Sequence, residues 1–370
     1  MNKTEHHNKK FLGGILIHEH NYGGSYIASK KIANATNSIL VPLSDNKNTK
    51  NKNIFSIKIK KIFGKRFLAN INNISNIEKN VFLWHINYPS PIILPLIIFS
   101  KKPKIITFHF MPSKHPFKLE EKNIFNFLIN KLILNPSYKV ILNLMILLVD
   151  KLTFITNSQF LEYKNYILFK KIFHKKSIVI NNFIEKEIIS TFKKKHLKKI
   201  CILFVGRMNK LKGFDDLIEL CKNIKDKDIS FNFIGGGPLK EKSEDLFNIK
   251  SYSNIVNKKL LQYYDKSQIF ILPSYTEVFP MTILEAMARG LVILVSDIPG
   301  MREIVKEGRN GYLFKPGDTE KMKELILYLK NNPKEIERIS KNNLKDIHKF
   351  TAEKQIPKYI KVYNKVLKEK

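Results

Sequence analysis

Two glutamates, Glu277 and Glu285, are eight residues apart around the start of a predicted helix. Pro280 suits the first turn of that helix, where a missing N–H has no cost. The first amides of the helix would then be unpaired and would form an anion site at its N-terminus. A phosphate bound there would have both carboxylates nearby to accept hydrogen bonds from sugar hydroxyls, although two ordinary surface carboxylates would have the same spacing. The amides concerned are those of Met281, Thr282 and Ile283.

A second candidate cluster is Gly206-Arg207 followed by Lys212-Gly213, directly after a predicted strand at 202–205. One Arg and one Lys at the carboxyl end of a strand can clamp a diphosphate and neutralise the charge that grows on a leaving group. Two solvated cations in a loop are the alternative in so basic a chain.

Glycines follow two other predicted strands. Gly235-Gly236-Gly237-Pro238 ends the strand at 229–234, and Gly23-Gly24 stands between the first strand and the first helix. Glycine lets the backbone approach a ligand closely, so Gly236, Gly23 and Gly24 are candidate substrate contacts. Neither run has the G-x-G-x-x-G spacing, and a tight strand-to-helix turn would also explain both.

His109 ends a predicted strand at 105–108 and could bond a sugar hydroxyl or handle a proton. A structural histidine is equally compatible with that position. No histidine and carboxylate stand at metal-ligand spacing, so no metal is expected. The two cysteines, Cys201 and Cys221, exclude a disulfide framework.

Short apolar segments alternate with helical patterns along most of the 370 residues. Such alternation predicts parallel sheets with helices on both faces. The pattern is interrupted by a basic linker at 193–199 and then restarts. It ends in a tail, 352–366, whose apolar residues form one helical face that must dock on something. Predicted strands are 11–18, 39–42, 81–84, 105–108, 152–156, 177–180, 202–205, 229–234, 269–272 and 291–295, and predicted helices are 27–35, 124–134, 140–149, 213–224, 281–288 and 319–330.

These signals, taken together and in this order, resemble the GT-B retaining glycosyltransferases of family 4. The resemblance is strong over about 200–330 and weaker in the first half. In the second half it is carried by Gly206-Arg207, Lys212-Gly213, the glycine run at 235–237, Pro273-Ser274, Glu277, Glu285-Ala286-Met287-Ala288, Gly290, Asp297-x-Pro299-Gly300, Asn310-Gly311 and Pro316-Gly317-Asp318. In the first half it is carried by Gly23-Gly24, Thr107-x-His109, Thr156-Asn157-Ser158 and 180–185.

The resemblance implies an α/β, GT-B fold, with two Rossmann-like doubly wound domains facing each other across a cleft. The expected domains are an acceptor-binding domain at 1–190, a nucleotide-sugar-binding domain at 191–350, and a C-terminal helix at 351–370 that packs back on the first domain. The family often has glycine where Pro280 and Phe183 stand here. Pro280 removes one N–H from the loop that would face the phosphate.

The resemblance also implies the roles of individual residues. Arg207 and Lys212 would hold the donor diphosphate, and Glu285 would bind the ribose hydroxyls. Glu277 would contact the transferred sugar, and His109 would lie near it. Met281 and Thr282 would meet the sugar or its phosphate through their backbone, and Gly24 would sit near the phosphate. The implied reaction is transfer from a nucleoside-diphosphate sugar with retained configuration, without metal or other cofactor, to a surface polysaccharide or lipid-linked glycan.

The net charge of +33 comes mainly from the first part of the chain, since residues 1–200 hold 34 basic and 10 acidic residues. Such a field attracts polyanions, and an anionic membrane surface could meet the segments 54–67 and 91–99. Only six of the 65 basic residues are Arg, which disfavours nucleic acid as a partner. Compositional drift towards Lys, Asn and Ile would also explain the charge. No apolar run reaches the roughly 20 residues of a spanning helix, so the chain is expected in the cytoplasm or on the inner face of the membrane.

Three other functions compete with transfer. A sugar-nucleotide epimerase or a phosphorylase would share the fold, but the paired glutamates with Arg207 and Lys212 favour transfer. A polyanion- or nucleic-acid-binding protein would bind with steep salt dependence and without preference for a sugar nucleotide. A catalytically silent partner subunit would not need the four candidate residues of the second half. The presence of Arg207, Lys212, Glu277 and Glu285 therefore argues against that function.

Overall fold

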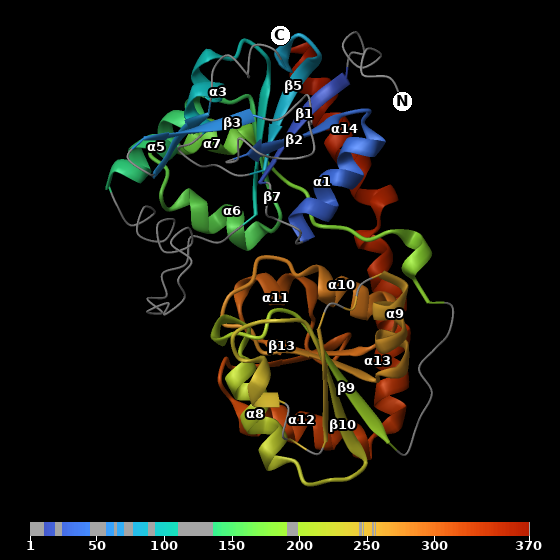
Figure 1. The fold of residues 1–370 in the computed structure, drawn as a ribbon. Coiled ribbons are helices and arrows are strands. Elements are labelled where there is room, and N and C mark those ends of the chain that lie inside the picture. Colours follow the sequence, from blue (N-terminus) through green and yellow to red (C-terminus); the bar gives the residue numbers. More distant parts are fainter. Residues whose placement is uncertain are drawn as a thin grey trace, which may run out of the picture. The chain divides into compact units, whose positions relative to one another are not determined.

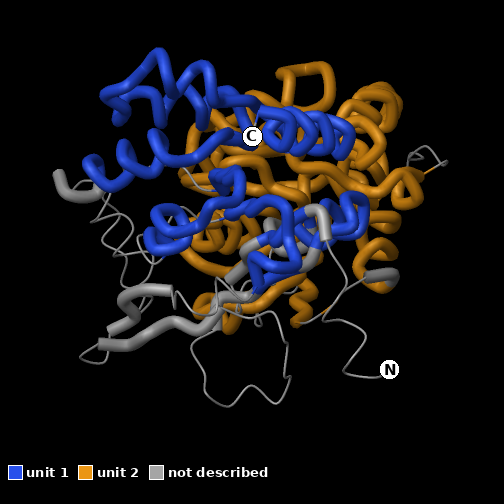
Figure 2. Tube along the Cα trace, turned by 90° about the horizontal axis from the view of Figure 1, so that it is seen from above, with its two compact units in different colours: residues 1–181, 355–370 blue, residues 182–354 orange. Residues whose placement is uncertain are grey.

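The structure is a computed structural model, and it describes residues 11–18, 24–44, 57–62, 65–69, 77–87, 93–109, 136–190, 199–243, 246, 248–253, 255 and 257–369. The chain separates into two compact units (Figure 2). Unit 1 comprises residues 1–181 and 355–370, and unit 2 comprises residues 182–354. The C-terminal helix α14, Ala352–Lys368, begins in unit 2 and continues into unit 1.

Unit 1 contains an eight-stranded sheet in the order β4-β3-β2-β1-β5-β6-β7-β8 (Figure 1). Its strands pair in parallel except at one edge, where β3 and β4 are antiparallel. This edge pair falls in the Lys/Ile-rich segment 54–67, for which the sequence indicated no strand. The strands are β1 (Phe11–His18), β2 (Ile39–Ser44), β3 (Ile57–Ile62), β4 (Lys65–Ala69), β5 (Val81–Ile86), β6 (Lys104–Phe108), β7 (Lys151–Phe154) and β8 (Ser177–Val179).

The core of unit 1 lies between this sheet and its helices. Phe108 and Phe154, on neighbouring strands, stack with 4.7 Å between ring centroids, and Tyr163 of the next helix packs on both. The helices are α1 (Gly24–Ala35), α3 (Leu94–Phe99), α5 (Pro136–Leu148), α6 (Asn157–Lys164) and α7 (Lys170–Lys176). The helix predicted at 124–134 and the linker at 193–198 lie outside the described residues.

The end of α14 is anchored to the sheet of unit 1 by a buried polar array. His85 of β5 bonds the Tyr363 hydroxyl through Nδ1 at 2.6 Å and the Thr107 hydroxyl through Nε2 at 2.5 Å. Thr107 in turn bonds Thr153 on β7. Burial, with a smaller contribution from His109, lowers the pKa of His85 to about 3, so its imidazole is neutral at pH 7.

Unit 2 contains a six-stranded parallel sheet in the order β11-β10-β9-β12-β13-β14. Its central strands are buried on both faces, which explains their continuous apolar sequences. The strands are β9 (Ile200–Val205), β10 (Ile229–Ile234), β11 (Ile249–Tyr252), β12 (Ile269–Leu272), β13 (Val292–Ser296) and β14 (Gly311–Phe314). The helices are α8 (Phe214–Asn223), α9 (Asn257–Lys266), α10 (Met281–Ala288), α11 (Pro299–Ile304), α12 (Thr319–Asn331) and α13 (Pro333–Asp346). Short 3-10 turns are η2 (Lys186–Ile188), η3 (Lys210–Lys212), η4 (Lys240–Ser243) and η5 (Ile347–Phe350).

In both sheets, the strands are added first to one side of the first strand and then to its other side. In unit 2 the first strand, β9, lies between the second, β10, and the fourth, β12, and in unit 1 β1 lies between β2 and β5. This is the doubly wound arrangement, in which ligands bind beyond the carboxyl ends of the strands at the point of reversal. The loops that follow β9 and β12 are therefore the expected site in unit 2, and those that follow β1 and β5 are the expected site in unit 1.

Candidate active site

The loop after β9 carries the two predicted cations. Arg207 is exposed, and among the described residues no partner is recorded for its guanidinium. Lys212 ends a short 3-10 turn that Asn209 caps, since the Asn209 side chain accepts from the Lys212 amide at 3.1 Å. Gly213 then takes a left-handed φ of 66° and starts α8. Any Cβ there would lie 2.1 Å from the Pro273 carbonyl oxygen, so glycine is required for this close approach between the two loops.

The loop after β12 carries Glu277, and the structure brings this carboxylate to Lys212. Lys212 Nζ and Glu277 Oε1 form an ion pair, and the Ser274 hydroxyl donates to the same oxygen at 3.2 Å. The Glu277 side chain is only 12% exposed, whereas that of Lys212 is 28% exposed. A partly exposed ammonium with further N–H donors can hold a buried carboxylate and still meet a ligand from the solvent side.

Backbone contacts hold the two loops together. The Tyr275 amide donates to the Leu211 carbonyl at 2.9 Å. On the other side, a Cβ at Gly300 would lie 2.3 Å from the Val278 carbonyl oxygen, so the start of α11 can pack against the Glu277 loop only with glycine there. The Asn182 side chain also donates to the Phe279 carbonyl at 3.0 Å. The position of Glu277 is therefore set by three segments remote from it in the chain.

The N-terminus of α10 differs from the prediction in one detail. Pro280 is the N-cap with extended backbone, and the helix begins at Met281. The Ile283 amide donates to the Pro280 carbonyl at 3.3 Å. It is therefore not unpaired as predicted, because the first turn is tight enough to close an i to i+3 bond. The amides of Met281 and Thr282 remain the ones available to an anion.

Glu285 lies one turn further along α10, half-buried. Its Oε2 accepts a hydrogen bond from the Tyr264 hydroxyl at 2.8 Å. Tyr264 is fully buried, and burial together with the Glu285 charge raises its pKa well above the usual value. The phenol is thus a permanent donor that orients Glu285. Glu285 is thus oriented by a neutral phenol, whereas Glu277 is held by an ammonium and a serine hydroxyl.

The glycine loop after β10 is tied to the Arg207 loop. The Gly206 amide donates to the Ile234 carbonyl at 3.0 Å, and the Met208 amide donates to the Gly236 carbonyl at 2.9 Å. A Cβ built at Gly236 would meet nothing within 4 Å. The predicted contact Gly236 therefore borders open space, next to the loop that carries Arg207.

In unit 1 the sequence identified His109, and the structure adds Asn87 as a partner, which Ser29 holds in place in turn. The Asn87 amide nitrogen donates to Ser29 Oγ at 2.6 Å, which leaves the Asn87 carbonyl oxygen 3.2 Å from His109 Nε2. Nε2 must then carry the proton, and a neutral His109 has its unprotonated nitrogen at Nδ1. Burial lowers the pKa of His109 to about 4, so the ring is neutral at pH 7 and its unprotonated nitrogen is an acceptor by chemistry.

One further predicted contact of unit 1, Gly24, stands at the start of α1. Gly24 is the first residue of that helix, and Ser29 of the same helix bonds Asn87. Gly23 lies outside the described residues. Asn87 and Ser29 could not be predicted from the sequence because isolated Asn and Ser residues carry no spacing signal. The same holds for Tyr264, which stands in no motif.

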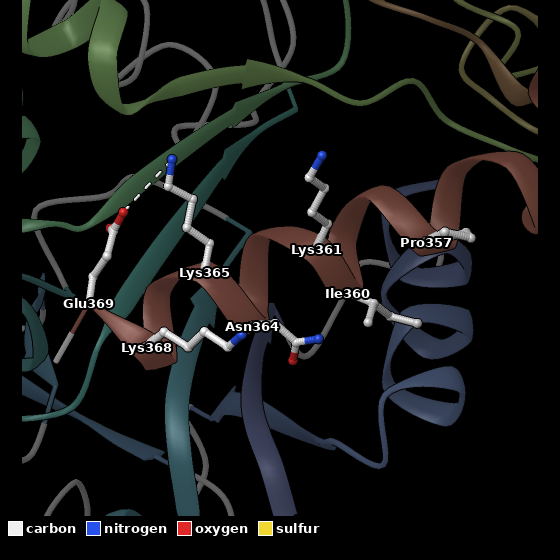
Figure 3. A pocket seen from close by; sticks show the side chains of 7 residues that line it. All are labelled: Pro357, Ile360, Lys361, Asn364, Lys365, Lys368 and Glu369. Atoms are coloured by element: carbon white, nitrogen blue, oxygen red, sulfur yellow. Dashed lines mark ion pairs between the residues drawn. The ribbon is translucent and has the colours of Figure 1, made fainter.

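Among the described residues, no group of three or more His, Cys, Asp or Glu side chains is placed to hold a metal ion. No helix in that part of the chain is long and apolar enough to cross a membrane. A hollow of about 490 Å³ runs along α14 in unit 1 (Figure 3). It contains none of the predicted site residues. Its lining residues are Pro357, Ile360, Lys361, Asn364, Lys365, Lys368 and Glu369.

Comparison with known families identifies the region that carries this site. Residues 185–346 match the family model described as glycosyl transferases group 1. The chain is 31% identical over 179 residues to N,N'-diacetylbacillosaminyl-diphospho-undecaprenol alpha-1,3-N-acetylgalactosaminyltransferase from Campylobacter jejuni, which is 46% of each chain. The chain spans about a quarter to about half of the length of the first curated relatives that it matches, from 25% to 54%.

Solved structures resemble the chain over nearly its whole length. A glycosyltransferase from Rickettsia africae superposes with a TM-score of 0.75 at 18% identity and covers 98% of this chain and 100% of its own. HepE from Anabaena, solved in complex with UDP-glucose, superposes with a TM-score of 0.73 at 13% identity over 97% of this chain and 100% of its own. The predicted α/β GT-B fold class is thereby confirmed, and the comparisons support a group 1 glycosyltransferase.

Proposed function

We propose that this protein is a retaining glycosyltransferase of family 4, which transfers a sugar from a nucleoside-diphosphate sugar to a glycan or lipid-linked acceptor. The observation that carries the proposal is the Lys212–Glu277 ion pair beside exposed Arg207, at the strand-order reversal of unit 2. This pair lies inside the segment that matches the group 1 family model. The relative from Campylobacter jejuni bears a name that describes sugar transfer to a diphospho-undecaprenol carrier.

In the proposed reaction, the bond between the anomeric carbon and the diphosphate oxygen breaks, and its electron pair stays on that oxygen. Arg207 and Lys212 neutralise the charge that develops there, which stabilises the transition state more than the ground state. The acceptor hydroxyl oxygen bonds to the same face of the anomeric carbon, so configuration is retained. Its proton passes to the departing phosphate.

The carboxylates and the histidine position the reactants. Glu285, held by Tyr264, accepts from the ribose hydroxyls, and Glu277 accepts from the transferred sugar. Neutral His109 accepts from a sugar hydroxyl through Nδ1, and Gly23, Gly24 and Gly236 allow close approach of the backbone. Two fixed cations supply the positive charge that a metal ion would otherwise provide, so the proposed reaction needs no metal and no other cofactor. The protein would act in the cytoplasm or on the inner face of the membrane.

The first test is a thermal shift of the purified protein against UDP-, GDP-, CMP- and dTDP-sugars at low and high salt. A ligand at about 100 times its dissociation constant stabilises by about 2.7 kcal/mol, enough for a shift of a few degrees. A selective shift that survives high salt supports the proposal and names the donor base. No shift with any sugar nucleotide, together with salt-sensitive binding to nucleic acid, would replace it with a polyanion-binding function. Product analysis by NMR then separates transfer from epimerisation.

A further inference from the structure

Exposed apolar side chains are distributed unequally between the two units. Of the large hydrophobic residues that are exposed in the described part of the chain, eleven belong to unit 1 and one, Tyr328, belongs to unit 2. Scattered single exposures are ordinary, but a contiguous group marks an interaction surface. The arrangement of the unit 1 residues therefore decides whether they form such a surface.

The exposed residues of α5 form a ridge. Val140, Leu144 and Leu148 are spaced four residues apart, which puts them on one side of the helix. The other side of α5 is in the core, where Leu142 and Met145 are almost fully buried. The helix is thus apolar on both sides, although only one side has a partner within the described chain.

The segment between α6 and α7 extends this ridge. The Leu168 amide donates to the Asn143 side chain of α5 at 2.8 Å, so the Leu168 backbone lies beside the middle of this helix. Its side chain is 76% exposed, and Phe169 and Ile172 follow it as exposed residues. Helix α7 is tied to the end of α5 because Lys176 Nζ donates to the Val149 carbonyl at 2.6 Å and to two carbonyls of the last turn.

Helix α3 packs against α5 and adds two more exposed residues, Ile98 and Phe99. Figure 1 shows α3, α5 and α7 on the same side of unit 1. We use "apolar ridge" for the exposed residues of these elements. They are Ile98, Phe99, Val140, Leu144, Leu148, Leu168, Phe169 and Ile172.

Exposed lysines occur on two of the helices that carry the apolar ridge, α5 and α7. Residues 136–180 contain seven Lys against one Asp and one Glu. Lys170, Lys171 and Lys175 of α7 are exposed, as is Lys139 at the start of α5. Apolar side chains next to flexible cations fit the boundary between lipid headgroups and acyl chains, where the lysines meet anionic headgroups.

We propose that the apolar ridge and the α7 lysines dock unit 1 on an anionic lipid bilayer. This inference rests on the proposed function, because a lipid-linked acceptor would be met at such a surface. It also revises the sequence-predicted contacts. The segment 91–99 contributes through Ile98 and Phe99, whereas nothing is described of the side chains of 54–67.

The test is co-flotation of the full chain with vesicles of phosphatidylcholine alone and of phosphatidylcholine mixed with phosphatidylglycerol. Wild type should float only with the mixed vesicles. Leu144→Ser and Leu168→Ser should each lower partitioning about 10- to 100-fold, since a buried leucine contributes about 1.5–3 kcal/mol. Tyr328→Ser, an exposed position in unit 2, is the matched control and should float like wild type.

A lysine series provides a second variant that does not alter packing. Lys170→Gln, Lys171→Gln and Lys175→Gln combined should lower partitioning at least a hundredfold, at about 1 kcal/mol per lysine. Lys222→Gln, Lys225→Gln and Lys227→Gln combined remove the same charge from unit 2 and should have little effect. Equal flotation of both triple variants would overturn the proposal, because binding would then follow net charge alone.

Two other results would also overturn it. One is failure of wild type to float with the mixed vesicles, and the other is flotation of the leucine variants at the wild-type level. A wild-type dimer that Leu144→Ser converts to a monomer, without flotation of either, would assign the ridge to a second copy of the chain. The sugar-nucleotide thermal shift, measured on the same variants, reports the proposed function separately.

Discussion

Both units reverse their strand order beside their first strand, but they present different chemistry at the carboxyl ends of their strands. Unit 2 places Arg207, Lys212 and Glu277 there, and it pairs a largely shielded carboxylate with a more exposed ammonium. Unit 1 places Asn87 and His109 after its strands, and both are neutral at pH 7. The same scaffold therefore suits an anionic ligand in one unit and neutral hydroxyl groups in the other.

The difference has a physical basis. Fixed cations stabilise a diphosphate whose charge grows during bond cleavage. A neutral histidine with a lowered pKa neither repels nor attracts that charge strongly, and it accepts hydrogen bonds from sugar hydroxyls. If this division of roles is correct, variants of unit 2 should affect donor binding and the chemical step, and variants of unit 1 should spare donor binding.

The largest effect is expected for Lys212→Ala. It removes a cation from the leaving group and leaves Glu277 without its ion-pair partner. Loss of one such group costs about 10²–10³ in kcat. Steady-state kinetics with the identified donor would measure this, with circular dichroism to confirm folding. Lys242→Ala, which breaks an exposed pair with Asp215 in the same unit, is the control. Unchanged turnover in a folded Lys212→Ala variant would contradict the proposed role of Lys212 in stabilising the leaving group.

Glu285→Gln should weaken donor binding about 10- to 100-fold, because a hydrogen bond to a charged group contributes about 1.5–3 kcal/mol. Isothermal titration calorimetry with the nucleoside diphosphate measures the change. Tyr264→Phe should also weaken donor binding, but by less, because it removes the hydroxyl that orients the Glu285 carboxylate. Glu324→Gln, at an exposed position of α12, is the control. Equal affinity for the nucleotide in Glu285→Gln and wild type would remove Glu285 from the site.

His109→Asn should lower kcat about 10- to 100-fold with nearly unchanged affinity for the nucleotide, and this split distinguishes the two units. Asn87→Ala should have a smaller effect in the same direction because it removes the carbonyl oxygen that accepts from His109 Nε2. Nitrogen NMR of the histidines should show the Nε2–H tautomer for His109 in wild type and a mixture in Asn87→Ala. Loss of nucleotide affinity in His109→Asn would contradict the division of roles.

The smallest effect concerns stability against pH. His85 and His109 have folded-state pKa values of about 3 and about 4, below the usual 6.5. The unfolded state therefore binds more protons below pH 6.5, and stability should fall as pH is lowered from 7 to 5. Urea midpoints at several pH values measure this slope. His85→Gln should flatten it, and the unit 2 variant Glu324→Gln should not. A wild-type slope of zero between pH 7 and 5 would contradict the neutral, buried state of both rings.

Much of the fold could be predicted from local pattern. The strand at 11–18 and the helix at 281–288 occur with the predicted bounds, because their apolar runs and flanking residues are unambiguous. The β3–β4 pair was missed because Lys and Ile alternate there in a segment that also fits a solvated loop. Helix α7 was missed because its Lys-rich sequence buries only Phe173.

The candidate site, like the fold, was predicted from the sequence only in part. The residue types and their order along the chain determined that Arg207, Lys212, Glu277 and Glu285 are candidates for one anion site, since each follows a strand or starts a helix. Only the tertiary structure decided that Lys212 bonds Glu277, that Tyr264 orients Glu285 and that Asn87 sets the tautomer of His109. Each of these pairs joins side chains at least 21 residues apart. Sequence spacing carries no signal for such a pair, because the meeting depends on strand order in the sheet and on the close packing of loops at its edge.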